Sequence, residues 1–117
     1  MADPGGQPTI STHVLDTERG MPAPGVRVTL YRLDVGEAPI RLTQALTDAD
    51  GRIRDLLERP LAAGDYRLEF DLAARDPGQG AGFFRRLSID LTVADPGRSY
   101  HVPLLLAPFA MTTYRGS

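Results

Sequence analysis

The chain has 117 residues, of which 42% are hydrophobic and 24% charged, a balance that suits one folded domain and excludes an intrinsically disordered chain. It contains no cysteine, which excludes disulfides, thiolate metal sites and thiol nucleophiles. A formal net charge of -2 gives no general attraction to nucleic acid or to an anionic membrane, and no apolar run is long enough to cross a bilayer. We therefore expect neither a nucleic-acid partner nor a membrane partner.

Ten prolines and twelve glycines divide the chain into short segments, a pattern typical of an all-β domain. Residues 1–8 are expected to form a flexible leader ahead of a single domain at residues 9–117. The leader has neither a basic flank nor an apolar stretch, so we expect no secretory signal and a cytoplasmic protein. Hydrophobic alternation and turn residues predict strands at residues 9–15, 26–33, 40–47, 52–56, 65–70, 87–93, 100–106 and 110–114, with a helix of one or two turns at 71–75. Short strands at this regular spacing predict a β-sandwich.

The two histidines of the chain both fall on predicted strands. His13 shares one strand face with Ser11, and His101 shares one with Pro103. Proline inside a strand removes a backbone donor, which predicts either an edge strand or an interrupted pairing at Pro103. Because residues 100–106 are apolar on both faces, we expect a partner subunit to cover one of them. Taken alone, a histidine on a strand is more often structural than catalytic.

Arg52 follows the Asp-Gly turn at residues 48–51 and stands at the head of a strand, with Arg54 as its competitor on the same face. Two imidazoles and a guanidinium suit hydrolysis of a small anionic or carbonyl-rich molecule, because imidazole can take a proton from water and arginine can stabilise a developing oxyanion. Two histidines without cysteine and without a His-x-x-x-His spacing make a metal site a poor alternative, so we expect no metal and no cofactor. The terminal YRGS at residues 114–117 could bind a polar group or could simply fray, as most chain ends do.

Five blocks of the sequence resemble the transthyretin-related proteins, and among them the 5-hydroxyisourate hydrolases. The blocks are STHVLD at 11–16, TDADGR at 47–52, GDYR at 64–67, YHVPLLL at 100–106 and YRGS at 114–117. The resemblance covers nearly the whole chain from Thr9 onward, and the terminal YRGS distinguishes these hydrolases from the transthyretins that carry thyroid hormone. One departure is Phe83-Phe84-Arg85, where relatives often have Phe-Phe-Pro; it touches no proposed catalytic residue.

The resemblance implies a transthyretin-like β-sandwich of two four-stranded sheets with one short helix, assembled as a homotetramer, a dimer of dimers. Its channel would carry the active sites at its mouths. By resemblance, the reaction is hydrolysis of 5-hydroxyisourate to 2-oxo-4-hydroxy-4-carboxy-5-ureidoimidazoline, on the route from urate to allantoin. The implied catalytic residues are His13, Arg52, His101 and Ser117, and the implied substrate-binding residues are His13, Arg52, Tyr114 and Arg115.

Two other functions remain open at this point. One is a non-enzymatic transthyretin-like carrier of a small apolar ligand, against which the two histidines and the arginine argue, because they would be costly to desolvate around such a ligand. The other is a structural or adhesive sandwich without a ligand. Which histidine acts as general base also stays open, with His13 as the first choice.

Overall fold

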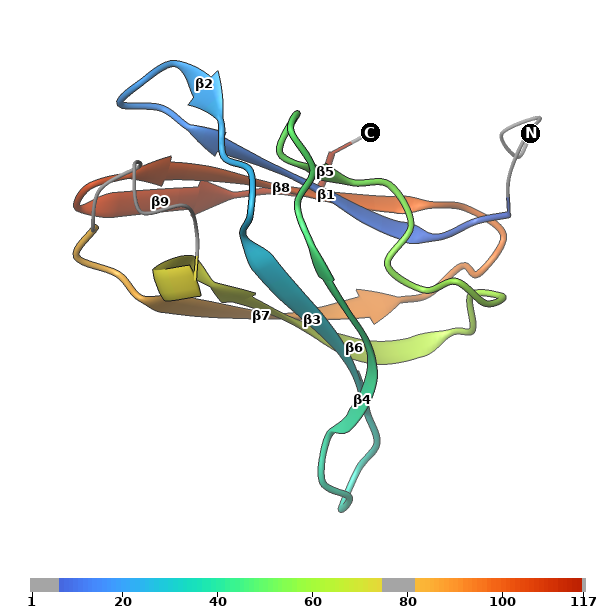
Figure 1. The fold of residues 1–117 in the computed structure, drawn as a ribbon. Coiled ribbons are helices and arrows are strands. Elements are labelled where there is room, and N and C mark those ends of the chain that lie inside the picture. The colour runs from blue at the N-terminus through green and yellow to red at the C-terminus, as the bar shows by residue number, and fades with distance from the viewer. Residues whose placement is uncertain (1–6, 75–81, 117) are drawn as a thin grey trace.

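Two β-sheets packed face to face make up the fold in the computed structural model, which describes residues 7–74 and 82–116 (Figure 1). The first sheet has the order β2-β1-β8-β9, with β5 paired to β1. The second sheet has the order β4-β3-β6-β7. The strands of the first sheet are β1 (Ile10–Asp16), β2 (Met21–Pro22), β5 (Arg52–Ile53), β8 (Tyr100–Ala107) and β9 (Ala110–Thr113). Those of the second are β3 (Arg27–Leu33), β4 (Ile40–Leu46), β6 (Gly64–Asp71) and β7 (Arg86–Val93).

The predicted all-β sandwich is confirmed, and each of the eight predicted strands has a counterpart. The first sheet, however, has five strands rather than the expected four. The two-residue strand β2 was not predicted, and it pairs with the end of β1 through Leu15 and Pro22. Of the predicted helix at 71–75, the structure shows a 3-10 turn at Leu72–Ala74; Asp71 belongs to β6, and Arg75 lies outside the described residues.

The core lies between the sheets and is built by strand alternation. On β1 every second residue, from Ile10 to Asp16, is buried, and β6 follows the same rule from Tyr66 to Phe70. Burial of these side chains is the main stabilising contribution to such a sandwich. The largest fully buried side chains are Tyr66, Phe70, Ile10, Leu30, Leu56, Leu57, Leu68, Leu104, Val14, Val26, Val28 and Val93.

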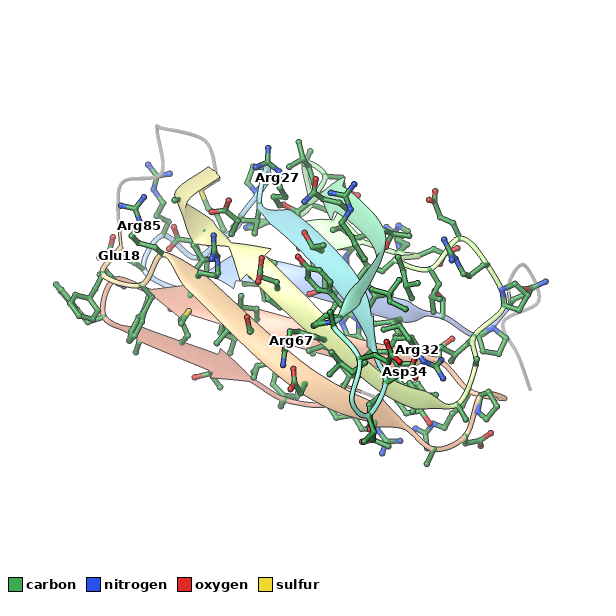
Figure 2. All side chains as sticks on the ribbon, turned by 90° about the horizontal axis from the view of Figure 1, so that it is seen from below. Glu18, Arg27, Arg32, Asp34, Arg67 and Arg85 are labelled. Atoms are coloured by element: carbon green, nitrogen blue, oxygen red, sulfur yellow. The ribbon has the colours of Figure 1, made fainter. Side chains whose placement is uncertain are left out.

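The outer face of the second sheet is charged. Cross-strand ion pairs cover it, among them a two-pronged pair in which Arg67 Nε and Nη2 donate to the Asp90 carboxylate at 2.7 and 3.0 Å. Figure 2 looks onto this face, with Arg67 near its middle. Such exposed pairs contribute little to stability, and they mark a solvated surface.

The first sheet places the amino-terminal and carboxy-terminal parts of the chain side by side. Its strands β1 and β8 are parallel, with Ser11 opposite His101 and His13 opposite Pro103. A parallel pair requires a long connection, and here the entire second sheet lies between the two strands in the chain. The outer face of the first sheet therefore collects side chains from both ends of the sequence.

Pro103 lies in a central strand. Of the two predictions for it, the edge strand is therefore wrong and the interrupted pairing is confirmed. Strand β8 is flanked by β1 and β9, but its ladder with β9 begins only at Leu104, which faces Thr113. At Pro103 a side chain makes the bond toward β9, since Thr113 Oγ1 donates to the Pro103 carbonyl at 2.8 Å. Beyond this gap the chain end pairs again, as an isolated bridge between Gly116 and His101 in the register of the β8–β9 ladder.

Candidate active site

Strand register brings His13, Arg52 and His101 together on the outer face of the first sheet. His13 faces Arg52 across the antiparallel pair β1–β5. On its other side His13 faces Pro103, and His101 lies two residues earlier on β8, on the same strand face. All three site residues are partly buried. Directly opposed and diagonal neighbours in a sheet are within side-chain reach of one another, so the three predicted residues form one cluster.

A tight turn holds Arg52 in this position. The Asp48 carboxylate accepts hydrogen bonds from the backbone amides of Asp50 and Arg52 at 2.9 and 3.0 Å. The hydrogen bond from the backbone amide of Arg52 is the main reason that the pKa of Asp48 lies below its usual range. Gly51 has a φ of 74°, and a Cβ there would collide with the carbonyl oxygen of Val14. Glycine is therefore required where the turn presses against β1.

The guanidinium of Arg52 is available to a ligand. Within residues 7–74 and 82–116 it makes no ion pair or side-chain hydrogen bond, although its backbone is bonded to Asp48. Arg54, the competing arginine, lies beyond the end of β5 and is exposed. The structure thus favours Arg52, which opposes His13 directly, as the arginine of the site.

Each imidazole is fixed by a different kind of partner. His13 Nε2 lies 2.9 Å from the backbone carbonyl oxygen of Asp50. His101 Nδ1 lies 2.8 Å from the Ser11 hydroxyl. Burial lowers the pKa of His101, and the nearby charges of Arg52 and His13 lower it further. His101 is therefore neutral at physiological pH and can accept or relay a proton.

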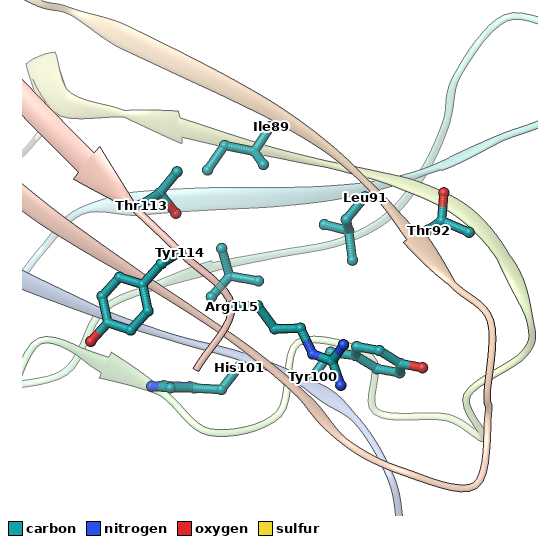
Figure 3. A pocket seen from close by; sticks show the side chains of 9 residues that line it. Ile89, Leu91, Thr92, Tyr100, His101, Thr113, Tyr114 and Arg115 are labelled. Atoms are coloured by element: carbon teal, nitrogen blue, oxygen red, sulfur yellow. The ribbon is translucent and has the colours of Figure 1, made fainter. Parts of the chain in front are cut away.

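The chain end lies against His101. The Gly116 amide donates to the His101 carbonyl at 2.7 Å, and a Cβ on Gly116 would come within 2.7 Å of His101 Cδ2. Only glycine lets the backbone approach the ring this closely. The exposed Tyr114 lies on the same side as His101 (Figure 3). The tail is thus tethered at the site rather than frayed.

Arg115, a residue of the predicted site, points away from His13 and Arg52. Arg115 turns to the opposite side of β8, where its guanidinium stands 5.5 Å from the centre of the Tyr100 ring (Figure 3). There it lines a groove with Ile89 and Leu91 of the second sheet. His101 and Tyr114 line the same groove, but the guanidinium of Arg115 lies over Tyr100 and not beside His13 or Arg52. Ser117 lies outside the described residues.

Sequence reasoning missed three contributors: the Asp48 carboxylate, the Asp50 carbonyl and the role of Ser11 as the partner of His101. Ser11 could have been found from its position two residues before His13 on the same face. The sequence predicts an Asx-type turn at Asp48. The contacts of this turn with His13 and Arg52 depend on how it packs on β1, which the local sequence does not specify.

Comparison with known proteins agrees with the fold. The sequence profile of the HIUase/Transthyretin family matches residues 10–116. The chain belongs to this family. A 5-hydroxyisourate hydrolase of Deinococcus radiodurans is 43% identical over 118 residues, covering 96% of this chain and 98% of that protein. A 5-hydroxyisourate hydrolase of Caulobacter vibrioides is 42% identical, covering 92% of this chain and 97% of that protein.

Solved structures of this family place the hydrolases and the hormone carriers on one fold. The structure of Klebsiella pneumoniae 5-hydroxyisourate hydrolase superposes with a TM-score of 0.78 at 39% identity, covering 93% of this chain and 99% of that one. Sea bream transthyretin in complex with thyroxine superposes with a TM-score of 0.81 at 29% identity, covering 92% and 93%. Backbone similarity alone does not separate the two functions within the HIUase/Transthyretin family, so side chains must do so.

Proposed function

We propose that this chain hydrolyses 5-hydroxyisourate to 2-oxo-4-hydroxy-4-carboxy-5-ureidoimidazoline, as its relatives' names indicate. The observation that carries the proposal is the strand register that sets His13 against Arg52 and beside His101 on one outward face. A hydrolase of a carbonyl-rich ring needs a base for water and a positive group for the developing oxyanion. The cluster supplies both, and no cofactor enters the reaction.

In the proposed mechanism water attacks a ring carbonyl while an imidazole, His13 in the first instance, takes its proton. Arg52 stabilises the negative charge that develops on the carbonyl oxygen. The new C–O bond forms and the ring C–N bond breaks. The proton that His13 took from water is then returned to the leaving nitrogen, and neutral His101 can relay it there. Tyr114 and Arg115, which line one groove together with His101, bind substrate, and Ser117 orients the water.

The active assembly is proposed to be a homotetramer, a dimer of dimers, in the cytoplasm. Support comes from the outer face of the first sheet, where Leu15, Pro103 and Leu105 surround the polar cluster. This apolar surround contrasts with the charged outer face of the second sheet. A second subunit packed over the first sheet would exclude water from the cluster and strengthen its electrostatic interactions. Within the described residues no helix is long and apolar enough to cross a membrane.

A second candidate function is that of a small-ligand carrier, favoured by the superposition on thyroxine-bound transthyretin. A carrier site for an apolar ligand would have to desolvate His13, Arg52 and His101 together, which is costly. Arg52 is the sharpest objection, because an apolar ligand offers no negative charge to a guanidinium that makes no ion pair or side-chain hydrogen bond within the described residues.

The test is to generate 5-hydroxyisourate in situ from urate and to follow its disappearance with a catalytic dose of the protein. Acceleration over spontaneous decay, with many turnovers per subunit, supports the hydrolase. A carrier would instead retain at most one ligand per site and leave the decay rate of the remainder unchanged. No acceleration would therefore exclude the proposed reaction.

A further inference from the structure

One carboxylate connects the two halves of the proposed site. Asp48 accepts the backbone amide of Asp50 and that of Arg52, at 2.9 and 3.0 Å. Asp50 presents its carbonyl oxygen to His13. Arg52 faces His13 across the pair β1–β5 and carries the guanidinium of the site. Asp48 itself reaches neither His13 nor a substrate on that face, so any influence it has on the reaction passes through its two neighbours.

The contact with Asp50 determines which nitrogen of His13 holds the proton. A carbonyl oxygen can only accept a hydrogen bond, so His13 Nε2, at 2.9 Å, must donate. In the neutral ring the lone pair then resides on Nδ1. His101 differs, because its Nδ1 meets a hydroxyl that can donate or accept. The tautomer of His13 is therefore set by the turn, and that of His101 is not.

We propose that Asp48 is a positioning residue that holds the Asp50 carbonyl against His13 and the Arg52 guanidinium opposite it, so that His13 takes the proton from water at Nδ1. The assignment rests on the proposed hydrolysis. To that function the proposal adds which nitrogen of His13 is the base, and it names Asp48 as the residue that determines this.

The turn does not depend on this carboxylate for its existence. The backbone of Asp48 is bonded on both sides, since its amide donates to the Arg52 carbonyl at 3.0 Å and its carbonyl accepts the Gly51 amide at 2.9 Å. Gly51 in turn accepts the Val14 amide at 2.7 Å, which fastens the turn to β1. Removing the carboxylate should therefore leave the Asp50 carbonyl and the Arg52 side chain less fixed in position, while the pairing of β1 with β5 persists.

The first test is the tautomer itself, read by NMR from the ring nitrogens of labelled histidine in the intact protein. With only two histidines in the chain, a His101→Gln variant assigns the signals. We expect His13 to be the Nε2–H tautomer in the wild type and a mixture of tautomers in Asp48→Ala. Asp48→Asn keeps an oxygen acceptor for both amides and should restore the wild-type spectrum. An Nδ1–H tautomer in the wild type would overturn the proposal, even if Asp48→Ala failed to fold.

The second test is kinetic and uses a matched control. Asp55 also accepts two backbone amides, from Leu57 and Glu58 at 3.0 and 3.1 Å, but it holds no residue of the site. We expect kcat for 5-hydroxyisourate to fall by up to roughly 100-fold in Asp48→Ala, with KM changed less, and to stay near wild type in Asp48→Asn and Asp55→Ala. Equal rates in Asp48→Ala and Asp55→Ala would contradict the positioning role.

These tests separate failure of the positioning role from failure of the proposed function. If the wild type hydrolyses 5-hydroxyisourate but the His13 tautomer is Nδ1–H, the function stands and the role of Asp48 falls. If the tautomer depends on Asp48 as expected but the wild type does not accelerate the decay, the turn positions His13 for some other use and the proposed function falls.

Discussion

The Gly116 amide donates to the His101 carbonyl at 2.7 Å, and its α-carbon lies so close to the imidazole that a Cβ would come within 2.7 Å of Cδ2. Gly116 and the partly buried imidazole of His101 are therefore one structural unit. Because Pro103 leaves a gap in the β8–β9 ladder, the tail runs free of backbone pairing for two residues before it rejoins β8 at His101.

This contact predicts that Gly116→Ala impairs catalysis. The added methyl group must displace either the His101 ring or the tail, and a shift of about 1 Å can cost roughly 100-fold in rate. The measurement is kcat together with the thermal melting temperature. Gly97→Ala is the control, because in the loop between β7 and β8 its methyl group would meet only the Asp95 carboxylate. Unchanged turnover in Gly116→Ala would separate the tail from the site.

A second prediction concerns residues added after Ser117. An extension fused after Ser117 should disturb the pairing of Gly116 with His101 and lower activity strongly. The same extension fused before residue 1 should leave activity near that of the untagged protein. The comparison requires both tagged proteins and removal of each tag by protease, after which activity should return. A fully active carboxy-terminal fusion would show that the tail does not contribute.

The depressed pKa of His101 predicts how stability depends on pH. Burial comes first among its causes, and the charges of Arg52 and His13 add to it. Between this lowered pKa and the ordinary value of about 6.5 for histidine, the unfolded chain binds a proton that the folded chain does not. The free energy of unfolding should therefore fall as the pH drops through this window and level off above it.

The measurement is chemical unfolding across this pH range for the wild type and for His101→Gln, which cannot titrate at this position. The free energy of unfolding of the wild type, relative to that of His101→Gln, should fall as the pH drops through this window. Arg52→Gln should also raise the pKa of His101, observed by NMR titration, because it removes a nearby positive charge. A pKa for His101 at or above its ordinary value in the wild type would refute the electrostatic account of the site.

Core packing gives a prediction that is independent of function. Leu68, at the centre of β6, is fully buried, whereas Val35, in the loop after β3, is fully exposed. Leu68→Ala should lower the free energy of unfolding by about 2–5 kcal/mol, because it removes apolar contacts and leaves a cavity. Val35→Ala should change it by less than about 0.5 kcal/mol. Denaturant unfolding of both variants checks the sandwich core, and a small effect at Leu68 would contradict the fold.

Local sequence patterns predict the strands well but not the pairing that makes the site. Residues 87–93 alternate apolar and polar, and β7 follows them closely. The two-residue β2 carries no such pattern, since Met21 and Pro22 form a strand only because β1 lies beside them. Its existence follows from tertiary structure, which single-sequence reasoning does not reach.

The site shows the same division. Residue type pointed to His13, Arg52 and His101, but residue type alone does not place histidines from β1 and β8 side by side. That placement follows from a parallel pairing across most of the chain, and no local rule specifies it. The opposite orientation of Arg115, over Tyr100, depends on the register in which the tail rejoins β8, which the tetrapeptide does not encode.

The central claim is that the cluster of His13, Arg52 and His101 hydrolyses 5-hydroxyisourate. The most direct measurement is the decay of freshly generated 5-hydroxyisourate with catalytic amounts of wild type, Arg52→Ala and the matched variant Arg54→Ala. Both arginines lie in the same segment, but only Arg52 opposes His13. The account predicts rapid decay with wild type and Arg54→Ala, and a loss of roughly 100-fold or more with folded Arg52→Ala. Spontaneous decay rates with the wild type, or full activity in Arg52→Ala, would contradict it.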